Sequence, residues 1–138
     1  MHASSIVALA LGVAAVSGTA IPDLQTRDGA CDPECNFPNS MTCFDNGGAT
    51  LQKADIVAAA RNADRSGKPY EASASNIASE FCSMRAYRDI PFWTTTIPGP
   101  NSLVGSMYYA LASNGTFYFC GTTSGIDPSG WPGRCDYN

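Results

Sequence analysis

The side chains that could exchange protons in this chain are nearly all carboxylates, because the only histidine is His2. Histidine is the residue whose ordinary pKa suits proton transfer near neutral pH. Without it, the best candidate cluster is Asp89 with Arg85 and Arg88. Asp89 could accept a proton, and the two guanidinium groups could hold an anion such as a phosphate. The alternative is structural: Asp89 would be a strand carboxylate satisfied by a backbone donor or by Arg85, which lies four residues away and would share its strand face.

Cysteines form the second chemical feature, and all six lie beyond residue 30: Cys31, Cys35, Cys43, Cys82, Cys120 and Cys135. An even number of cysteines in a short secreted chain is typical of disulfides. A zinc site is the rival interpretation, but the chain has no Cys-x-x-Cys pair and no later histidine to complete one. We therefore expect disulfides, no metal and no other cofactor. Six cysteines allow 15 pairings, and their number alone does not choose among them.

The first 20 residues predict a secretion signal. An apolar run spans residues 3–16, and Gly18-Thr19-Ala20 has the small residues of a cleavage site, so we expect cleavage after Ala20. A buried helix or a membrane anchor is the alternative, yet the run is short for a membrane span and Pro22 follows it. The signal predicts a secreted, extracellular protein.

The remaining chain has the length of one domain, over residues 30–138, preceded by a short pro-segment or disordered N-terminus over residues 21–29. Its formal net charge is −4, from 8 basic and 12 acidic residues. Domains that bind nucleic acid through its phosphates usually carry a basic excess. We therefore expect no DNA binding and no strong non-specific RNA binding, although a local phosphate site stays compatible with this charge. We expect a monomer without membrane association.

One helix is predicted before the segment that carries Asp89. Ile56, Ala60 and Ala63 recur at helical spacing after a potential N-cap at Thr50, and Gly67 would end the helix. The small alanine side chains suit close packing against a sheet.

Strands are predicted in the second half. Residues 86–93 are short and aromatic, whereas residues 94–100 contain two prolines and indicate a loop. The strongest signal is a pair of apolar runs, 107–111 and 116–119, around Asn114-Gly115, a dipeptide that favours a type I′ hairpin turn. With Thr116 it also forms a glycosylation sequon on Asn114, although the turn alone would explain it. The pattern predicts an α+β fold: a single helix packed on a twisted antiparallel sheet, stapled by disulfides.

Taken in order, these segments resemble the fungal guanyl-preferring secreted ribonucleases. The shared features are an Ala-Cys-Asp-x-x-Cys start, a third cysteine before the helix, a tyrosine after it, a Tyr-x-acid-x-Pro strand, a hairpin and a late cysteine. In this chain they are Ala30–Cys35, Cys43, Tyr70, Tyr87–Phe92, Gly105–Gly125 and Cys135. The resemblance implies a microbial ribonuclease-like fold with Cys31 bonded to Cys43 and Cys35 to Cys135. It leaves Cys82 and Cys120 as the remaining pair.

The resemblance also assigns catalytic positions, most of which have lost their chemistry. Such enzymes direct the ribose 2′-hydroxyl at its own phosphate, with a Glu or His as base, an Arg stabilising charge and a second His as acid. Asp89 stands at the Glu position, Ala72 at the first His, Tyr108 at the Arg and Thr123 at the second His. Because a general acid or base is worth roughly 10²–10⁴ in rate, Asp89 would be vestigial. Asn76 lies near the base-recognition loop without the family's neighbouring residues, so guanine preference is not implied.

The degenerate cleft could still bind a partner. We expect it to be lined by Tyr70, Ala72, Asn76, Asp89, Tyr108 and Thr123, with Trp131 at its rim. Aromatic side chains there could stack on bases or anchor a protein interface. The alternative is that the tyrosines, Tyr109 among them, and Trp131 serve as packing.

We therefore expect a secreted, ribonuclease-like protein that has lost catalysis and binds a host protein or RNA. The non-catalytic ribonuclease-like effectors of plant-associated fungi are a class of this kind, and entry into a host cell would follow from that class. The alternative is a weak or altered endoribonuclease that cuts single-stranded RNA through a 2′,3′-cyclic phosphate, using Asp89 with Arg85 or Arg88. A surface-active antimicrobial protein is a third class, but such proteins are usually basic.

Overall fold

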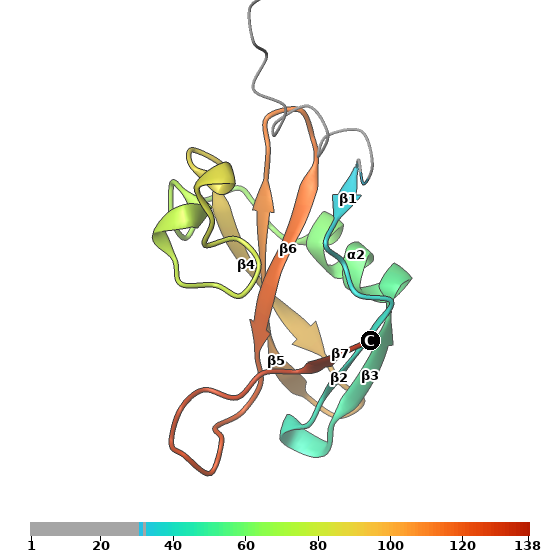
Figure 1. Ribbon diagram of the computed structural model, residues 1–138. Helices are drawn as coiled ribbons and strands as arrows, with labels where there is room; N and C mark the ends of the chain where they lie inside the picture. Colours follow the sequence, from blue (N-terminus) through green and yellow to red (C-terminus); the bar gives the residue numbers. More distant parts are fainter. Residues whose placement is uncertain (1–30, 32) are drawn as a thin grey trace, which may run out of the picture.

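The computed structural model describes residue 31 and residues 33–138, which form seven strands, one α-helix and three short 3₁₀ helices (Figure 1). Residues 1–30 and residue 32 are not described. The expected secretion signal, residues 1–20, and the expected pro-segment, residues 21–29, therefore lie outside the described residues. Within the described residues, no helix is long and apolar enough to span a bilayer.

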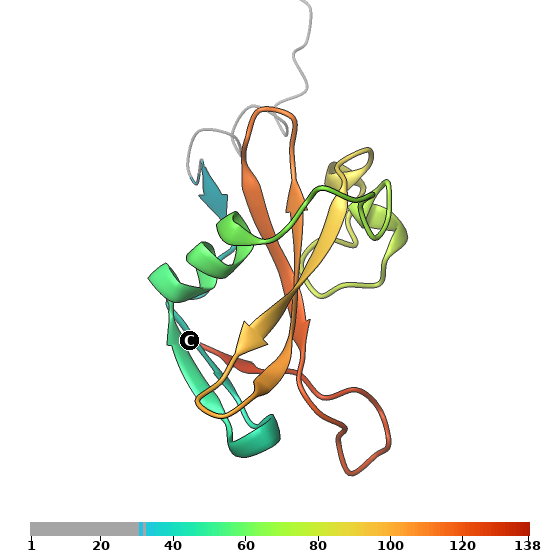
Figure 2. The same cartoon turned by 180° about the vertical axis from the view of Figure 1, so that it is seen from behind.

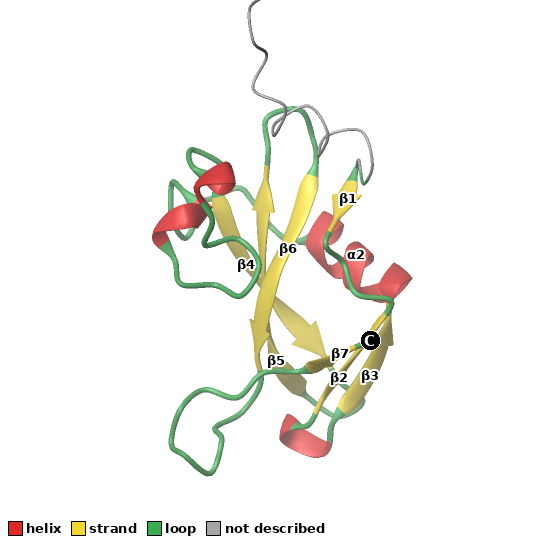
Figure 3. Cartoon of the chain, viewed as in Figure 1, coloured by secondary structure: helices red, strands yellow, loops and turns green. Residues whose placement is uncertain are grey.

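Two sheets form the framework (Figure 3). The larger has the strand order β1-β6-β5-β4, from Glu34–Cys35, Phe117–Thr123, Leu103–Leu111 and Phe92–Pro98. The smaller has the order β3-β2-β7, from Ala49–Gln52, Ser40–Cys43 and Asp136–Tyr137. The α+β prediction, with one helix on a sheet and disulfides, is confirmed at this level. The larger sheet is mixed, however, because β1 runs parallel to β6.

Helix α2 (Lys53–Asn62) begins two residues later than expected. Thr50 lies in β3, and Gln52 is the N-cap, with its backbone N–H donating to the Asp55 carboxylate in a capping box. The helix ends at Asn62, well before Gly67. The Arg65 guanidinium donates to the carbonyl oxygens of residues 60 and 61 and so caps the last turn. Ile56 and Ala60 form its buried face, as predicted. Figure 2 shows α2 between the two sheets.

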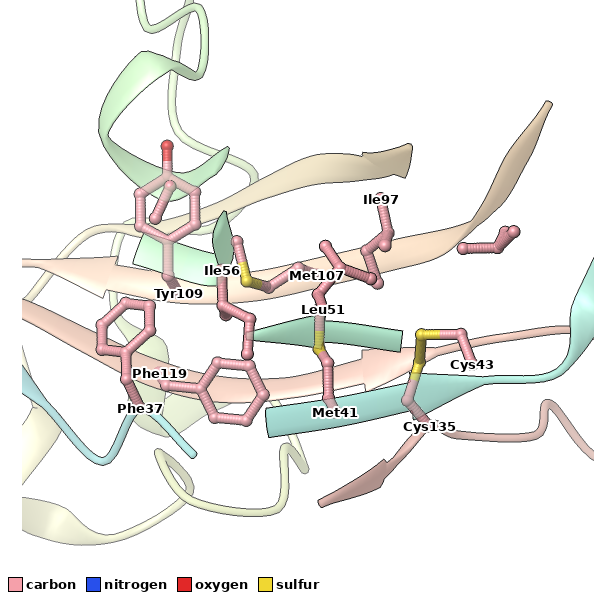
Figure 4. Packing of buried hydrophobic residues seen from close by; sticks show 12 residues of the cluster. Phe37, Met41, Cys43, Leu51, Ile56, Ile97, Met107, Tyr109, Phe119 and Cys135 are labelled. Carbon is pink, nitrogen blue, oxygen red and sulfur yellow. A yellow bond between two sulfur atoms is a disulfide. The ribbon is translucent and has the colours of Figure 1, made fainter. Parts of the chain in front are cut away.

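The main core fills the space between α2 and the two sheets (Figure 4). Its largest fully buried side chains include Met41, Ile56, Ile97, Met107, Tyr109 and Phe119. Tyr109 is therefore a packing residue, and its hydroxyl is satisfied by the Arg65 guanidinium at 3.1 Å. A second cluster, around Cys82, Tyr87, Phe92 and Tyr118, packs on the other side of the larger sheet. Burial of these apolar groups is the main favourable term in folding.

The strand predicted over residues 86–93 is wrong. The 3₁₀ helix η3 (Arg85–Tyr87) and a turn occupy this segment, and β4 begins only at Phe92. Asp89 adopts a left-handed backbone conformation with φ 65°, which belongs to a turn and interrupts any strand. Conversely, β4 runs through the segment expected to be a loop as far as Pro98. A proline is tolerated there because β4 is an edge strand.

The hairpin of β5 and β6 is confirmed, but its turn is not type I′. Only Gly115 has a positive φ, of 93°, whereas type I′ needs two such residues. Its N–H donates to the Ala112 carbonyl at 3.0 Å, and the Ala112 N–H donates to the Thr116 carbonyl at 3.0 Å. These bonds define a longer connection with a glycine in the left-handed position. The Asn114 side chain supports it by accepting a hydrogen bond from the Thr116 N–H at 3.0 Å.

Two of the three expected disulfides are wrong. Cys31 bonds to Cys35, and Cys43 bonds to Cys135, whereas the family pattern implied Cys31–Cys43 and Cys35–Cys135. The register explains the exchange, because β2 pairs Thr42 with Asp136 and so brings Cys43 to Cys135. Cys35 pairs with Tyr118 in the other sheet. The third expected disulfide, Cys82–Cys120, is confirmed.

Candidate functional site

An open cleft of about 490 Å³ lies beside the middle of β5 and the end of β6. Its floor comes from these strands, and its walls come from the segment before Cys82 and from the carboxyl-terminal segment before Cys135. The lining residues are Tyr70, Ile77, Ala78, Ser79, Glu80, Phe92, Tyr108, Cys120, Gly121, Thr122, Thr123, Pro132, Gly133 and Arg134. The cleft thus joins parts of the chain that are far apart in sequence.

Three aromatic rings make one side of the cleft. Phe92 and Tyr108 are stacked, with ring centroids 5.6 Å apart and an interplanar angle of 21°. The ring of Tyr70 is tilted against that of Phe92, with the two ring centroids 6.1 Å apart. Phe92 is buried and Tyr108 half-buried, but Tyr70 is 67% exposed. The buried ring therefore supports two tyrosines that remain accessible to a bound group.

The hydroxyl groups of Tyr108 and Thr123 are hydrogen-bonded to each other at 3.0 Å. Tyr108 lies opposite Gly121 in the β5–β6 register, and an irregularity follows between Tyr108 and Tyr109. This geometry brings Thr123, two residues beyond Gly121, within reach of the tyrosine hydroxyl. The family resemblance assigns Tyr108 to the position of the Arg and Thr123 to that of the second His. These two residues are thus neighbours whose hydroxyl groups are hydrogen-bonded to each other.

A charged pair also lines the cleft. Arg134 bonds to the Glu80 carboxylate at 2.9 Å, with both side chains partly exposed. An ion pair this accessible to solvent contributes only about 0–1 kcal/mol to stability. Its significance is chemical, because it adds an anion and a cation to a cleft that is otherwise lined by neutral side chains.

Tyr137 lies behind this part of the cleft, donating or accepting a hydrogen bond with Thr122 at 2.8 Å. Burial raises the pKa of the Tyr137 hydroxyl above its ordinary value, the bond to Thr122 opposes this, and the Glu80 charge adds to it. Tyr137 is therefore a structural support of the cleft wall, neutral at physiological pH.

The structure brings together only part of the predicted site. Tyr70, Tyr108 and Thr123 line the cleft, whereas Ala72, Asn76, Asp89 and Trp131 do not. The interpretation of Asp89 as a strand carboxylate paired with Arg85 is also wrong. Among the described residues the ion pairs are Arg61–Glu34 and Arg134–Glu80.

The other predicted residues lie on nearby surfaces. Asp89 is exposed on its turn, and its backbone N–H donates to the Ser73 hydroxyl at 3.2 Å. Asn76 ends the short helix η2 (Ala74–Asn76), and its amide reaches the Glu71 carboxylate at 3.4 Å. Trp131 lies in the segment that leads to the cleft wall and is 74% exposed, so it is not a core residue.

Sequence reasoning missed Glu80 and Arg134. One available signal could have found Glu80: the Cys82–Cys120 disulfide, which was predicted, ties the preceding segment to β6. The Phe81 N–H accordingly donates to the Cys120 carbonyl at 3.2 Å. Arg134 depends on the Cys43–Cys135 disulfide, which was not predicted.

Among the described residues, no group of three or more His, Cys, Asp or Glu side chains is arranged to hold a metal ion. Comparison with protein-family models, with curated proteins and with solved structures finds no match to this chain.

Proposed function

We propose that this chain is a secreted, ribonuclease-like protein that binds a partner in its cleft and does not cleave RNA. The observation that carries the proposal is the hydrogen bond between Tyr108 and Thr123. These are the positions that the family resemblance assigns to the phosphate-binding Arg and the acidic His. Here they hold two neutral hydroxyls that satisfy each other.

The chemistry of the cleft supports this proposal. Cleavage through a 2′,3′-cyclic phosphate needs a base for the 2′-hydroxyl and an acid for the leaving oxygen. Neither a threonine nor a tyrosine hydroxyl donates a proton near neutral pH as an imidazolium does. Asp89, the residue assigned to the base, lies outside the cleft. The assigned set therefore lacks the geometry as well as the side chains of the reaction.

The same surface suits a bound protein. Tyrosine offers a large, rigid contact area with a polar tip, and it is common among the residues that dominate interface energies. The exposed Tyr70 and the half-buried Tyr108 lie at ring-contact distances through Phe92. The net charge of −4 disfavours a polyanion. We infer a host protein as the main partner, with RNA second, as in ribonuclease-like fungal effectors.

Three disulfides support a location outside the cell that makes the protein. Disulfides form and persist in oxidising compartments and are rare in the cytosol. Action inside a host cell would require a later uptake step.

A second candidate function is favoured by one observation, the Glu80–Arg134 pair in the cleft. A carboxylate and a guanidinium are the two charged groups that a ribonuclease needs besides its acid. In this alternative Glu80 would accept the 2′-hydroxyl proton and Arg134 would hold the phosphate.

The test is an assay of the purified mature protein on single-stranded RNA, with detection of 2′,3′-cyclic phosphate ends. We expect no product above the buffer background. Cleavage abolished by Glu80→Gln, or by Asp89→Ala, would overturn the proposal, and the variant that abolishes it would identify the base. Ser113→Ala, on the hairpin far along the chain from both carboxylates, controls for contaminating nuclease, whose activity would not respond to any of the three substitutions.

Binding is tested on the same samples. Tyr70→Ala and Tyr108→Ala are expected to weaken partner binding roughly tenfold or more each, as removal of an aromatic anchor does. Tyr70→Phe keeps the ring and should retain most of the affinity. Equal partner affinity in the wild type and both alanine variants would show that this cleft is not the binding site.

A further inference from the structure

Exposed apolar side chains gather at the end of the molecule opposite the hairpin tip. Six large apolar residues of the described chain are exposed, and four of them belong to this end: Phe44, Leu103, Ile126 and Trp131. We call the surface formed by these four residues the apolar end. Figures 1 and 2 both show the segments concerned, near η1 (Asp45–Gly47), at the start of β5 and in the long loop before β7, at the same end. Contiguous exposed apolar surface usually marks an interaction site.

Hydrogen bonds hold these segments together. The Asn46 amide donates to the Leu103 carbonyl at 2.8 Å, and the Ser124 hydroxyl donates to the Val104 carbonyl at 2.7 Å. The Asp45 N–H reaches the Ser124 hydroxyl at 3.4 Å. The four apolar side chains therefore stand on one connected framework.

The loop that carries Ile126 and Trp131, residues 124–133, is itself ordered by backbone bonds. The Ser124 N–H donates to the Gly133 carbonyl at 2.9 Å, and the Gly133 N–H donates to the Gly125 carbonyl at 3.1 Å. Further out, the Asp127 N–H donates to the Trp131 carbonyl at 2.8 Å. Ile126 and Pro132 face each other in this antiparallel arrangement. Gly133 permits the close approach, since a Cβ there would lie 2.6 Å from the Ser124 carbonyl oxygen.

This order matters for binding because a preformed loop loses little conformational freedom when it docks. Ile126 is 78% exposed and Trp131 is 74% exposed, although the backbone beneath them is fixed. Large apolar groups exposed to water on an ordered backbone are suited to contact with a partner.

The charges around the apolar end favour one kind of occupant. Asp127 lies on the loop, exposed, and the Asp45 carboxyl lies against Gly125, where an added Cβ would be 3.4 Å from its Cγ. The nearest cation along the chain, Arg134, is paired with Glu80. An apolar surface with an acidic border is complementary to apolar side chains flanked by Lys or Arg. It would repel an anionic lipid surface.

We propose that the apolar end binds a cationic, amphipathic segment of a partner protein, through Ile126 and Trp131 with Asp127 and Asp45 at the border. The proposal goes beyond the cleft and does not depend on whether the cleft is catalytic. It assigns a second contact surface to the same molecule.

The test uses the disulfide-bonded mature protein as bait for a displayed library of random linear peptides. Peptides that bind are expected to combine aromatic or aliphatic residues with Lys and Arg. Their affinity should fall about tenfold or more in Ile126→Ser and Trp131→Ser and by a smaller factor in Asp127→Asn, and it should weaken as salt rises. Met84→Ser, which removes an exposed apolar side chain elsewhere, is the matched control and should bind as the wild type does. Unchanged melting temperatures will show that the variants are folded.

Four outcomes would overturn the proposal. Peptides that bind Ile126→Ser and Trp131→Ser as tightly as the wild type, or no enrichment at all, would exclude this surface as a peptide site. Binding to vesicles of phosphatidylcholine, alone or mixed with phosphatidylserine, that is lost in Trp131→Ser would identify a lipid as the occupant. Self-association in sedimentation velocity that Trp131→Ser abolishes would identify a second copy of the chain. The cleft variants Tyr70→Ala and Tyr108→Ala should bind the peptides as the wild type does. This result would distinguish binding at the apolar end from binding in the cleft.

Discussion

The hydroxyl oxygens of Tyr108 and Thr123 lie 3.0 Å apart across the β5–β6 pair, next to the stacked ring of Phe92. Through this contact, the two hydroxyl groups on the floor of the cleft are hydrogen-bonded to each other. A ligand that competes for either hydroxyl must first replace this bond, whereas a ligand that uses the ring faces need not. The cleft is therefore better suited to apolar and aromatic contact than to capture of a phosphate.

The first prediction concerns the strength of this pair. Tyr108→Phe and Thr123→Val are each expected to lower the free energy of unfolding by about 0.5–1.5 kcal/mol, because each leaves one partly buried hydroxyl without its partner. The double variant should lose less than the sum of the two, since it removes both partners together. Urea unfolding of the four proteins measures the coupling. Strict additivity would show that water already satisfies both hydroxyls.

The disulfides give a second prediction. Peptide mapping without reduction should recover Cys31–Cys35, Cys43–Cys135 and Cys82–Cys120. Recovery of a peptide joining Cys31 to Cys43 would instead restore the pairing that the ribonuclease resemblance implies.

Removal of single disulfides should have unequal effects. The Cys43–Cys135 bond closes a loop of 92 residues and the Cys31–Cys35 bond one of 4. In the chain-entropy description, replacing both cysteines by alanine should cost about 4–5 kcal/mol for the long loop and about 2 kcal/mol for the short one. Thermal or denaturant unfolding of the two double variants gives the comparison. A larger loss for the short loop would mean that local packing, and not loop closure, sets the contribution.

The sequence predicted the helix and the main hairpin correctly because both have local signals. Apolar spacing marks Ile56 and Ala60 as the buried face of α2, and a glycine-containing turn marks the β5–β6 connection. Most of strand β4 was missed because Pro98 and Pro100 indicate a loop, and only the pairing with β5 shows that the strand continues to Pro98. Tertiary contact outweighed local preference there.

The cleft was predicted only in part for the same reason. Tyr70, Tyr108 and Thr123 were found through the resemblance to a family. Glu80 and Arg134 come together only because two disulfides tie distant segments to the sheet, and one of those disulfides was assigned wrongly. Asp89 was misplaced because a turn with a positive φ replaced the expected strand.

Tyr137 provides a prediction on pH. Burial raises its pKa above the ordinary value of 10.0, so the folded protein retains a proton that the unfolded chain releases. The contribution of Tyr137 to stability should therefore be constant below about pH 10 and fall as the pH rises from there toward the pKa of the folded state. Tyr137→Phe should reduce this alkaline slope, although it loses the bond to Thr122. Tyr70→Phe, at an exposed ring, is the control and should keep the wild-type slope; an unchanged slope in Tyr137→Phe would assign the effect to another group.

The last prediction concerns Asn114, in the sequon at the hairpin tip. Its side chain is exposed, and the hydrogen bond that it accepts from the Thr116 N–H at 3.0 Å uses Oδ1 and not Nδ2, the atom that would carry a glycan.

Thr116, the other residue of the sequon, is fully buried in the folded domain. Glycosylation should therefore occur only while the chain is still unfolded in the secretory pathway. Intact mass measured before and after endoglycosidase treatment is expected to reveal a glycan on protein secreted from a eukaryotic host and none on Asn114→Gln. Folded protein from bacteria, incubated with purified oligosaccharyltransferase and a lipid-linked donor, should remain unmodified.

Because the tip lies at the end of the molecule opposite the apolar end, both glycoforms should bind the same partners with equal affinity (Figure 1). Modification of the folded protein would show that the hairpin opens readily, and loss of partner binding in the glycoform would place a contact surface at the tip.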